Sequence, residues 1–297
     1  MPLFDPDVLK RFHYLALVAR KAGGRSLLDA PRKKLPAGGT EVTSLRDYAA
    51  GDDIRAVYWT WCARRDELLT KVFEGSGDLH LYVLLDCSAS MGLGRPSKFH
   101  VARQIAAALG YVALLNLDRL GVAAFADGLL ADLPLLRHKT RLPRLLRFLE
   151  QLKPQEGRTD LARAAAAFIR RCQRHGPVVV ISDLVDDQGF ERGLDILRFG
   201  GYEPRVLQIH DPRQLDPGLL GDVELLDVEG GTVQTATITE RAARRYCALV
   251  AEFRQTVRRY CGRCSIPLLQ VACDTPEDDL LLRALGGKPV KHPVQWR

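Results

Sequence analysis

Hydrophobic and polar positions follow two rhythms along the chain after residue 80. Short apolar runs bounded by turn residues predict buried strands, and apolar positions that repeat every three or four residues predict helices. The predicted strands are residues 81–86, 120–126, 129–136, 177–183, 203–210 and 266–272. The predicted helices are residues 98–116, 141–152, 160–175, 189–201, 239–261 and 276–287.

This alternation of strands and helices predicts the fold class. It is typical of an α/β protein with a doubly wound, mostly parallel sheet of the Rossmann type. The run PVVVIS is apolar at nearly every position, which favours a central parallel strand. Asp127-Gly128 predicts a hairpin turn, and a second hairpin is expected near residues 221–238. Ser97 and Thr140 are predicted to cap the helices that follow them.

The first part of the chain has a different pattern. Residues 1–78 are rich in loops, with one short amphipathic helix at the start and strands toward the end. We therefore expect an N-terminal extension over residues 1–78 and an α/β domain over residues 79–297.

Composition and the N-terminal sequence indicate the cellular location that we expect. The 297 residues are 46% hydrophobic, yet no apolar run approaches the ~20 residues that a membrane-spanning helix needs. The N-terminus lacks the features of a signal peptide, so we expect a cytoplasmic protein without a membrane span.

The 7 cysteines are scattered and are expected to be reduced. Cys261 and Cys264 have the spacing of half a zinc site or of a redox pair, but a packing role is favoured because no second pair matches.

The charge balance is basic, with a formal net charge of +7. A basic surface can contact nucleic acid or an acidic protein, and it can also be a solvated helix face. The chain has no zinc finger, no aromatic-interleaved basic strand and no glycine-arginine tract, so no nucleic-acid partner is expected.

Oxygen-bearing side chains gather where predicted strands end. Asp86, Ser88 and Ser90 follow the first strand, Asp183 ends a later one, and Thr159 lies in a loop just before a helix. In an open α/β sheet, ligands bind beyond the carboxyl ends of the strands. Hard oxygen ligands suit Mg²⁺ or Mn²⁺. Each side chain alone could instead cap a turn or a helix.

These five residues resemble the metal-ion-dependent adhesion site of von Willebrand factor A domains. The resemblance implies that Ser88, Ser90 and Thr159 supply hydroxyls, while Asp86 and Asp183 act directly or through water. It also implies that an acidic residue of a partner protein completes the metal shell. The implied function is a non-enzymatic, metal-dependent protein-binding module.

An upstream segment is similar to the signature of the domain of unknown function 58 family, which joins this signature to a von Willebrand A-like domain. The matching positions are Glu41, Leu45, Arg46, Tyr48, Gly51, Asp52, Asp53, Arg55, Trp59, Ala63 and Arg64. Tyr58 departs from the pattern, because an aspartate usually precedes the tryptophan. The charged members are predicted to form an ion-paired network, with Tyr48 and Trp59 as apolar anchors. The alternative is a docking surface.

The same resemblance implies a class of partner. Relatives often accompany MoxR-type AAA+ ATPases, so the chain is expected to be an adaptor for such an ATPase in the maturation or remodelling of other proteins. The expected partner is the ATPase or its client.

A serine hydrolase of the α/β type is the alternative function. Ser90, Asp183 and His210 occur in the chain order of such a triad. However, Ser88 replaces the first glycine of the nucleophile elbow, and residues 92–97 separate Ser90 from its helix. The chain also lacks a P-loop, so neither hydrolase nor ATPase activity is expected.

Overall fold

The computed structural model describes most of the chain after residue 79 and parts of what precedes it. The described residues are 10–15, 17, 34–35, 41–49, 54, 57–59, 61–62, 68–74, 79–116, 118–155, 157–172, 174–214, 220–227, 231 and 233–286. The chain divides into two compact units. Asp29–Leu79 form one, and Met1–Leu28 with His80–Arg297 form the other, so the N-terminal helix belongs with the sheet and not with the extension in which we had placed it.

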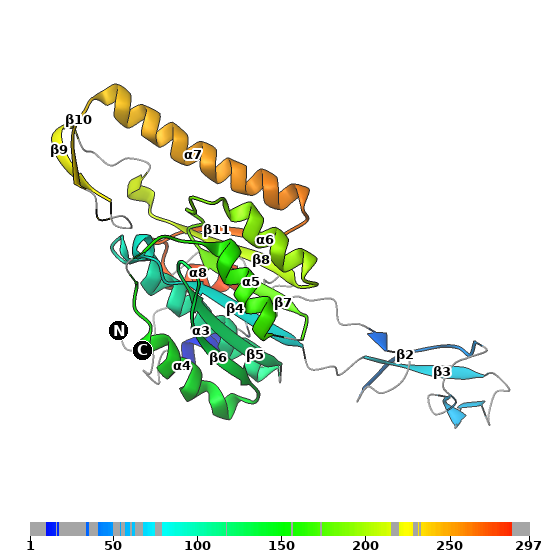
Figure 1. The fold of residues 1–297 in the computed structure, drawn as a ribbon. Coiled ribbons are helices and arrows are strands. Elements are labelled where there is room, and N and C mark those ends of the chain that lie inside the picture. The colour runs from blue at the N-terminus through cyan, green and yellow to red at the C-terminus, as the bar shows by residue number, and fades with distance from the viewer. Residues whose placement is uncertain are drawn as a thin grey trace. The chain divides into compact units, whose positions relative to one another are not determined.

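A mostly parallel sheet forms the centre of the larger unit, which confirms the predicted α/β class (Figure 1). Its strand order is β11-β8-β7-β4-β5-β6, and β6 alone among these strands runs antiparallel to its neighbour. The strands are β4 (His80–Asp86), β5 (Arg119–Phe125), β6 (Leu129–Leu136), β7 (Pro177–Ser182), β8 (Glu203–His210) and β11 (Leu268–Ala272). Every residue of β7 is buried, as expected for a central strand.

Helices cover both faces of this sheet. Successive side chains of a strand point to opposite faces, so Val83 and Leu84 of β4 belong to two different core clusters. The cluster around Val83 is completed by α3 (Lys98–Leu115), α4 (Leu142–Gln151) and α8 (Glu277–Ala284). The cluster around Leu84 is completed by α5 (Leu161–Arg171), α6 (Phe190–Phe199) and α7 (Glu240–Arg263).

Side-chain caps set where several helices begin. Ser97 accepts a hydrogen bond from the backbone N–H of His100 at 3.2 Å, as predicted for the start of α3. The prediction for Thr140 is wrong: it lies in the 3-10 helix Lys139–Arg141, and α4 begins after it without a side-chain cap. A proline in the first turn of α4 explains this start, because its fixed φ is already helical and it needs no hydrogen-bond acceptor.

The N-terminal helix packs against the sheet unit. Phe12 and Leu15 are buried in the same core cluster as α3 and α8. Arg11 forms an ion pair with Glu277 at 2.7 Å and another with Asp278, both at the start of α8. The three acids in the first turn of α8 are favourable for its dipole, and Arg11 pairs with two of them.

Small antiparallel sheets complete the fold. In the smaller unit, β1 (Lys34–Leu35), β2 (Glu41–Asp47) and β3 (Leu69–Glu74) pair in the order β1-β3-β2. In the larger unit, β9 (Gly221–Leu226) and β10 (Val233–Ile238) form the predicted second hairpin before α7. Among the described residues, no helix combines the length and the apolar character needed to cross a bilayer.

The packing of the N-terminal helix can be tested with a cavity variant. Phe12→Ala removes a buried ring from the core cluster and should lower the free energy of unfolding by about 3–5 kcal/mol. Leu17→Ala on the same helix is the control, because Leu17 is 47% exposed and its truncation should change little. Urea unfolding of the full chain measures both. Equal effects of the two variants would contradict this packing.

Candidate functional site

The sheet has one point where the strand order reverses, between β4 and β7. From β4 the chain first builds the sheet outward through β5 and β6, and it then returns to β7 and builds the other half. Ligands of open α/β sheets bind at such a point, beyond the carboxyl ends of the strands. Asp86 ends β4, and Asp183 directly follows β7. Two of the predicted site residues therefore flank the switch point.

Asp86 is completely buried in this position. Its Oδ1 accepts a hydrogen bond from the Ser88 backbone N–H at 2.9 Å, and its Oδ2 accepts one from the Ser182 hydroxyl at 2.5 Å. Burial raises the pKa of Asp86, and the charge of Asp183 raises it further, while the hydrogen bonds from Ser182 and Ser88 oppose the shift. A positive charge near this carboxylate would stabilise its ionised form.

The two predicted serines connect the carboxylates. The Ser88 and Ser90 hydroxyl oxygens lie 3.1 Å apart, and Ser90 Oγ donates to Asp183 Oδ2 at 3.1 Å. Asp183 Oδ1 accepts a hydrogen bond from the Val185 backbone N–H at 3.1 Å. Asp86, Ser88, Ser90 and Asp183 are therefore brought together as predicted, all of them buried.

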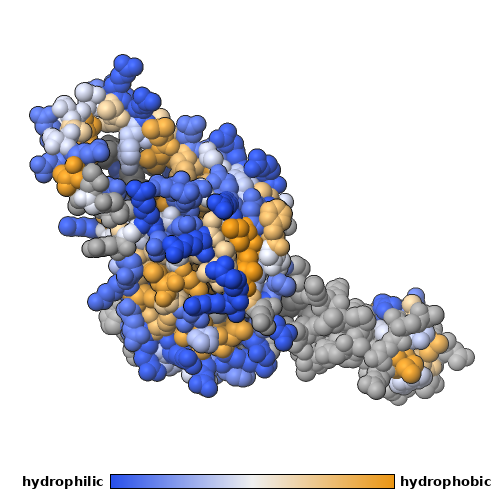
Figure 2. Space-filling view, in the orientation of Figure 1, coloured by the Kyte–Doolittle hydropathy of each residue, from blue (hydrophilic) through white to orange (hydrophobic). Residues whose placement is uncertain are grey.

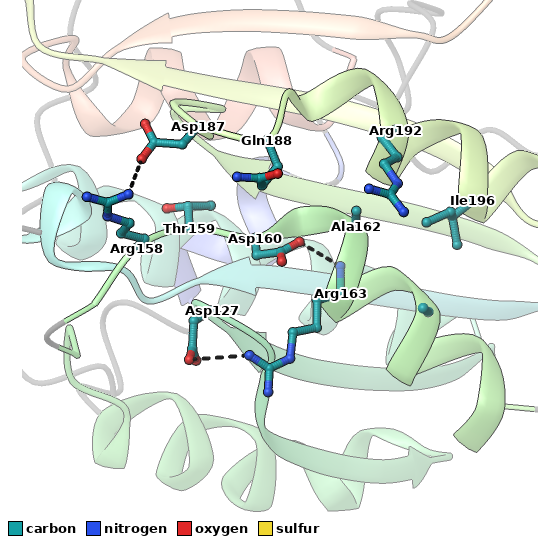
Figure 3. A pocket seen from close by; sticks show the side chains of 11 residues that line it. Asp127, Arg158, Thr159, Asp160, Ala162, Arg163, Asp187, Gln188, Arg192 and Ile196 are labelled. Carbon is teal, nitrogen blue, oxygen red and sulfur yellow. Dashed lines mark hydrogen bonds and ion pairs between the residues drawn. The ribbon is translucent and has the colours of Figure 1, made fainter.

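Thr159 is buried at the same edge of the sheet. The next residue, Asp160, donates its backbone N–H to the carbonyl of Ala126, which follows β5. The Thr159 hydroxyl has no hydrogen-bond partner within the described part of the chain. Leaving a buried hydroxyl unpaired costs about 1–3 kcal/mol, so a ligand atom here would be stabilising. Arg158 does not compete for this position, because its exposed side chain pairs with Asp187 at 3.1 Å (Figure 3).

The structure adds a residue that the sequence analysis missed. Lys98, the first residue of α3, is 1% exposed, and its Nζ lies 2.5 Å from Asp183 Oδ2. A lysine in the first turn of a helix is unfavourable for the helix dipole, and this placement was the sequence feature that could have identified Lys98 as a site residue. Ser182 and Gln208 were missed as well. Gln208 donates to the backbone carbonyl of Asp183 at 3.0 Å and so helps to fix its position.

The donor set fits a small divalent cation. The cluster offers carboxylate and hydroxyl oxygens, and the unpaired Thr159 hydroxyl is an unused donor atom. Mg²⁺ and Mn²⁺ prefer such ligands. Among the described residues, no group of three or more His, Cys, Asp or Glu side chains could hold a metal. A metal site here would therefore depend on hydroxyl ligands.

A pocket of about 430 Å³ opens beside Thr159 (Figure 3). Its lining alternates in charge, with Arg163 facing Asp127 at 3.7 Å on one side and the Arg158–Asp187 pair on the other. Its remaining lining residues are Thr159, Asp160, Ala162, Ala166, Gln188, Arg192 and Ile196. Such a pocket suits a polar or charged side chain better than an apolar one.

The hydrolase alternative receives no support from the geometry. A catalytic serine must donate its hydrogen bond to the triad histidine, which the triad acid in turn orients. The described partners of the Ser90 hydroxyl are Ser88 and Asp183, and Asp183 pairs with Lys98. His210 ends β8, and its Nδ1 is buried without a partner in the described structure. Burial, followed by the charge of Arg254, lowers the pKa of His210 to about 4.

The upstream signature lies in the smaller unit and is described in part. Arg46 is exposed, and its Nη1 donates to the Asp47 carbonyl at 3.3 Å, while Tyr48 is half-buried. Trp59 is 60% exposed, so the prediction that it is an apolar anchor is wrong within this chain. The backbone N–H of Tyr58 donates to the Leu69 carbonyl, at the start of β3. The predicted charge network cannot be followed, because several members lie outside the described residues: Asp52, Asp53, Arg55 and Arg64.

The two cysteines at the end of α7 are not joined by a disulfide. Cys261 is buried in the core cluster around Leu84, and Cys264 is partly buried against it. Burial, and then the charge of Cys264, raises the pKa of Cys261 to about 11. A thiol with a raised pKa is a poor nucleophile, so these contacts agree with a packing role.

Comparison with known proteins places the chain in a family. The model of the family described as "Protein of unknown function DUF58" matches residues 44–256. The chain belongs to the DUF58 family. Uncharacterized proteins of Mycobacterium tuberculosis and Mycobacterium bovis are each 28% identical to it over 244 residues, which is 81% of this chain and 77% of theirs.

The comparison with solved structures gives matches of low similarity. The conserved hypothetical protein BatB of Bacteroides thetaiotaomicron matches with a TM-score of 0.44 and 18% identity, over 70% of this chain and 97% of that one. The TRAP protein of Plasmodium vivax, solved loaded with manganese, has a TM-score of 0.33 and 18% identity over 44% of this chain and 57% of its own. At these scores the similarity adds nothing to what the strand order of the DUF58 chain shows.

The environment of His210 predicts a pH dependence of stability. Its pKa is lower in the folded protein than in the unfolded chain, so the unfolded chain binds more protons below about pH 6.5. The free energy of unfolding should therefore fall as the pH falls, and His210 should contribute roughly 1–2 kcal/mol of the loss between pH 7 and pH 5 after solvent screening. Urea unfolding of wild type and His210→Gln at both pH values measures this contribution. The exposed His138→Asn variant is the control, and a wild-type slope retained by His210→Gln would contradict the assignment.

Proposed function

We propose that this DUF58 protein is a non-enzymatic protein-binding module that holds Mg²⁺ or Mn²⁺ at the switch point of its sheet. The main support is the buried oxygen cluster, in which two carboxylates and two serine hydroxyls are connected while the Thr159 hydroxyl has no partner in the described structure. A solely structural cluster would be expected to satisfy that hydroxyl internally.

Each member of the cluster has a distinct role in this proposal. Asp86 and Asp183 supply negative charge, and the backbone and Ser182 contacts of Asp86 hold it in one orientation. Ser88, Ser90 and Thr159 supply neutral oxygens, which add no further negative charge to the site. A divalent ion, when bound, offers an exposed Lewis-acidic position to an acidic side chain of a partner.

The surroundings of the site also favour an acidic partner. The buried side chains of α7 are Val257, Tyr260 and Cys261, all in its C-terminal half. Its N-terminal half carries arginines and two exposed apolar residues, Tyr246 at 45% and Leu249 at 54%. Hydrophilic side chains cover much of this end of the molecule, interrupted by hydrophobic ones (Figure 2).

Tyr246, in the N-terminal half of α7, lies within electrostatic range of Asp211, which follows β8. A partner bound at the sheet edge can therefore reach the arginines at the start of α7. These are Arg241, Arg244 and Arg245.

The proposed partner is a MoxR-type AAA+ ATPase or its client. This assignment rests on family membership, because DUF58 proteins often accompany such ATPases. In this proposal the chain is an adaptor that connects the ATPase to a protein undergoing maturation or remodelling, and it performs no hydrolysis itself.

Metal binding is tested by titration of the purified full chain. Isothermal titration calorimetry with Mg²⁺ and Mn²⁺ should give weak binding to wild type, and Asp86→Asn should weaken it at least about tenfold because the site loses one of its two charges. Asp132→Asn is the control, since Asp132 pairs with Arg171 away from the site. Equal heats for wild type and Asp86→Asn would exclude this metal site.

Partner binding should depend on the same site. Chelation should weaken the complex with the ATPase or its client roughly ten- to a hundredfold without unfolding either protein, because one charge-assisted contact is lost. Ser88→Ala with Ser90→Ala should have the same effect. Replacing Arg241, Arg244 and Arg245 by Gln should remove a salt-sensitive component that persists in EDTA. Co-purification that is indifferent to EDTA and to the serine changes would move the interface to the segment around Trp59.

A further inference from the structure

The buried ammonium of Lys98 is the least expected feature of the site. Its side chain is 1% exposed, that of Asp183 is 5% exposed, and the two form an ion pair. A buried charge is tolerated only when it is paired, because removal from water costs several kcal/mol per ion. An aliphatic residue at this helix position would avoid that cost. The position of Lys98 therefore requires an explanation within the site.

The charges of the cluster explain why a lysine lies at this position. Asp86 and Asp183 bring two negative charges into the end of an apolar sheet, and the residues that hydrogen-bond to them, Ser88, Ser90 and Ser182, are all neutral. A divalent ion would neutralise the pair completely. Lys98 neutralises one of the two charges and contacts the oxygen of Asp183 that also accepts the Ser90 hydroxyl. The ammonium thus uses an atom that the proposed metal site needs.

We infer that Lys98 is a built-in counter-ion of this site and that a divalent ion binds only by displacing its ammonium from Asp183. The inference rests on the proposed divalent-ion site and adds that the Lys98 ammonium and the metal compete for Asp183. The cluster is then held together in the absence of metal, and the affinity for metal alone is kept low.

A second carboxylate is available to the displaced ammonium. Asp211 is buried just after β8, where Arg213 holds it through both carboxylate oxygens, at 3.0 and 2.7 Å. It lies near the loop that leads to Lys98, because a side-chain carbon at Gly94 would meet Asp211 Oδ2 at 3.3 Å. A lysine side chain is flexible enough to exchange one carboxylate for another without moving α3.

The competition links metal binding to partner binding. With Lys98 still near the site, a bound divalent ion leaves an excess of positive charge at the edge of the sheet. A carboxylate from a partner would offset that excess, so metal and acidic partner should each increase the affinity for the other. Without Lys98, only the direct contact between the metal and the partner's carboxylate would link the two binding events, and their coupling should be weaker.

The direct test removes the ammonium. Lys98→Met in the full chain should bind Mn²⁺ at least about tenfold more tightly than wild type, as measured by calorimetry, because a competing cation is gone. Its melting temperature in EDTA should fall by roughly 6–20 °C and should recover when Mn²⁺ is added. Arg103→Met is the matched control: Arg103 lies on the same helix, bonds the Leu149 carbonyl and should show neither effect.

The second test needs no variant. Lysine acylation of the wild-type protein, followed by mass spectrometry, should leave Lys98 protected in EDTA, since it is buried and paired. Saturating Mn²⁺ should increase the modification of Lys98 several-fold relative to the other lysines. This measurement remains decisive if Lys98→Met does not fold.

The outcomes separate this inference from the proposed function. If wild type and Lys98→Met bind Mn²⁺ equally and Lys98 stays protected at saturation, the competition is wrong while the metal site stands. If neither protein binds Mn²⁺, both the metal site and the competition are wrong. Tight binding by Lys98→Met with weak or no binding by wild type supports the inference.

Discussion

Two carboxylates placed in the apolar end of a sheet set the requirements for everything around them. Asp86 and Asp183 end up beside each other because β4 and β7 are neighbours at the point where the strand order reverses. Their mutual repulsion and their burial both disfavour charge, which is why the pKa of Asp86 is raised. Hydrogen bonds from Ser182 and Ser88 and the ammonium of Lys98 offset this cost.

The rest of the fold keeps this cluster rigid. Helices on both faces bury the strands that carry the acids, and the N-terminal helix extends one of these core clusters over α3 and α8. The backbone of Lys98 is held in the first turn of α3, which Ser97 caps. The N-terminal half of α7 differs in this respect. The N-terminal half of α7 contributes no side chain to the core, so its exposed apolar residues are free to contact another protein.

Much of the fold followed from the sequence because strand and helix periodicities are local properties. The same holds for Asp86, Ser88 and Asp183, since side chains at strand ends of a parallel sheet are brought to one edge by topology. Other features depended on which of several possible contacts a side chain makes in the folded chain, and the sequence does not show that. Thr140 does not cap α4, because this helix begins after it with a proline in the first turn. Trp59 was expected to be an apolar anchor but is exposed. His210 follows the chain order of a triad, yet the hydroxyl of Ser90 is directed to Asp183.

The sequence by itself determined the layered α/β architecture, the family and the oxygen-rich character of the site, because each is encoded in the spacing of residues along one segment. Only the tertiary structure decided which charges meet there. Lys98 lies 85 residues from Asp183 in the chain, and a lysine in a first helical turn is ordinarily solvated. It becomes a buried counter-ion because the fold places the first residue of α3 beside the residue that follows β7, and no local sequence pattern indicates that contact.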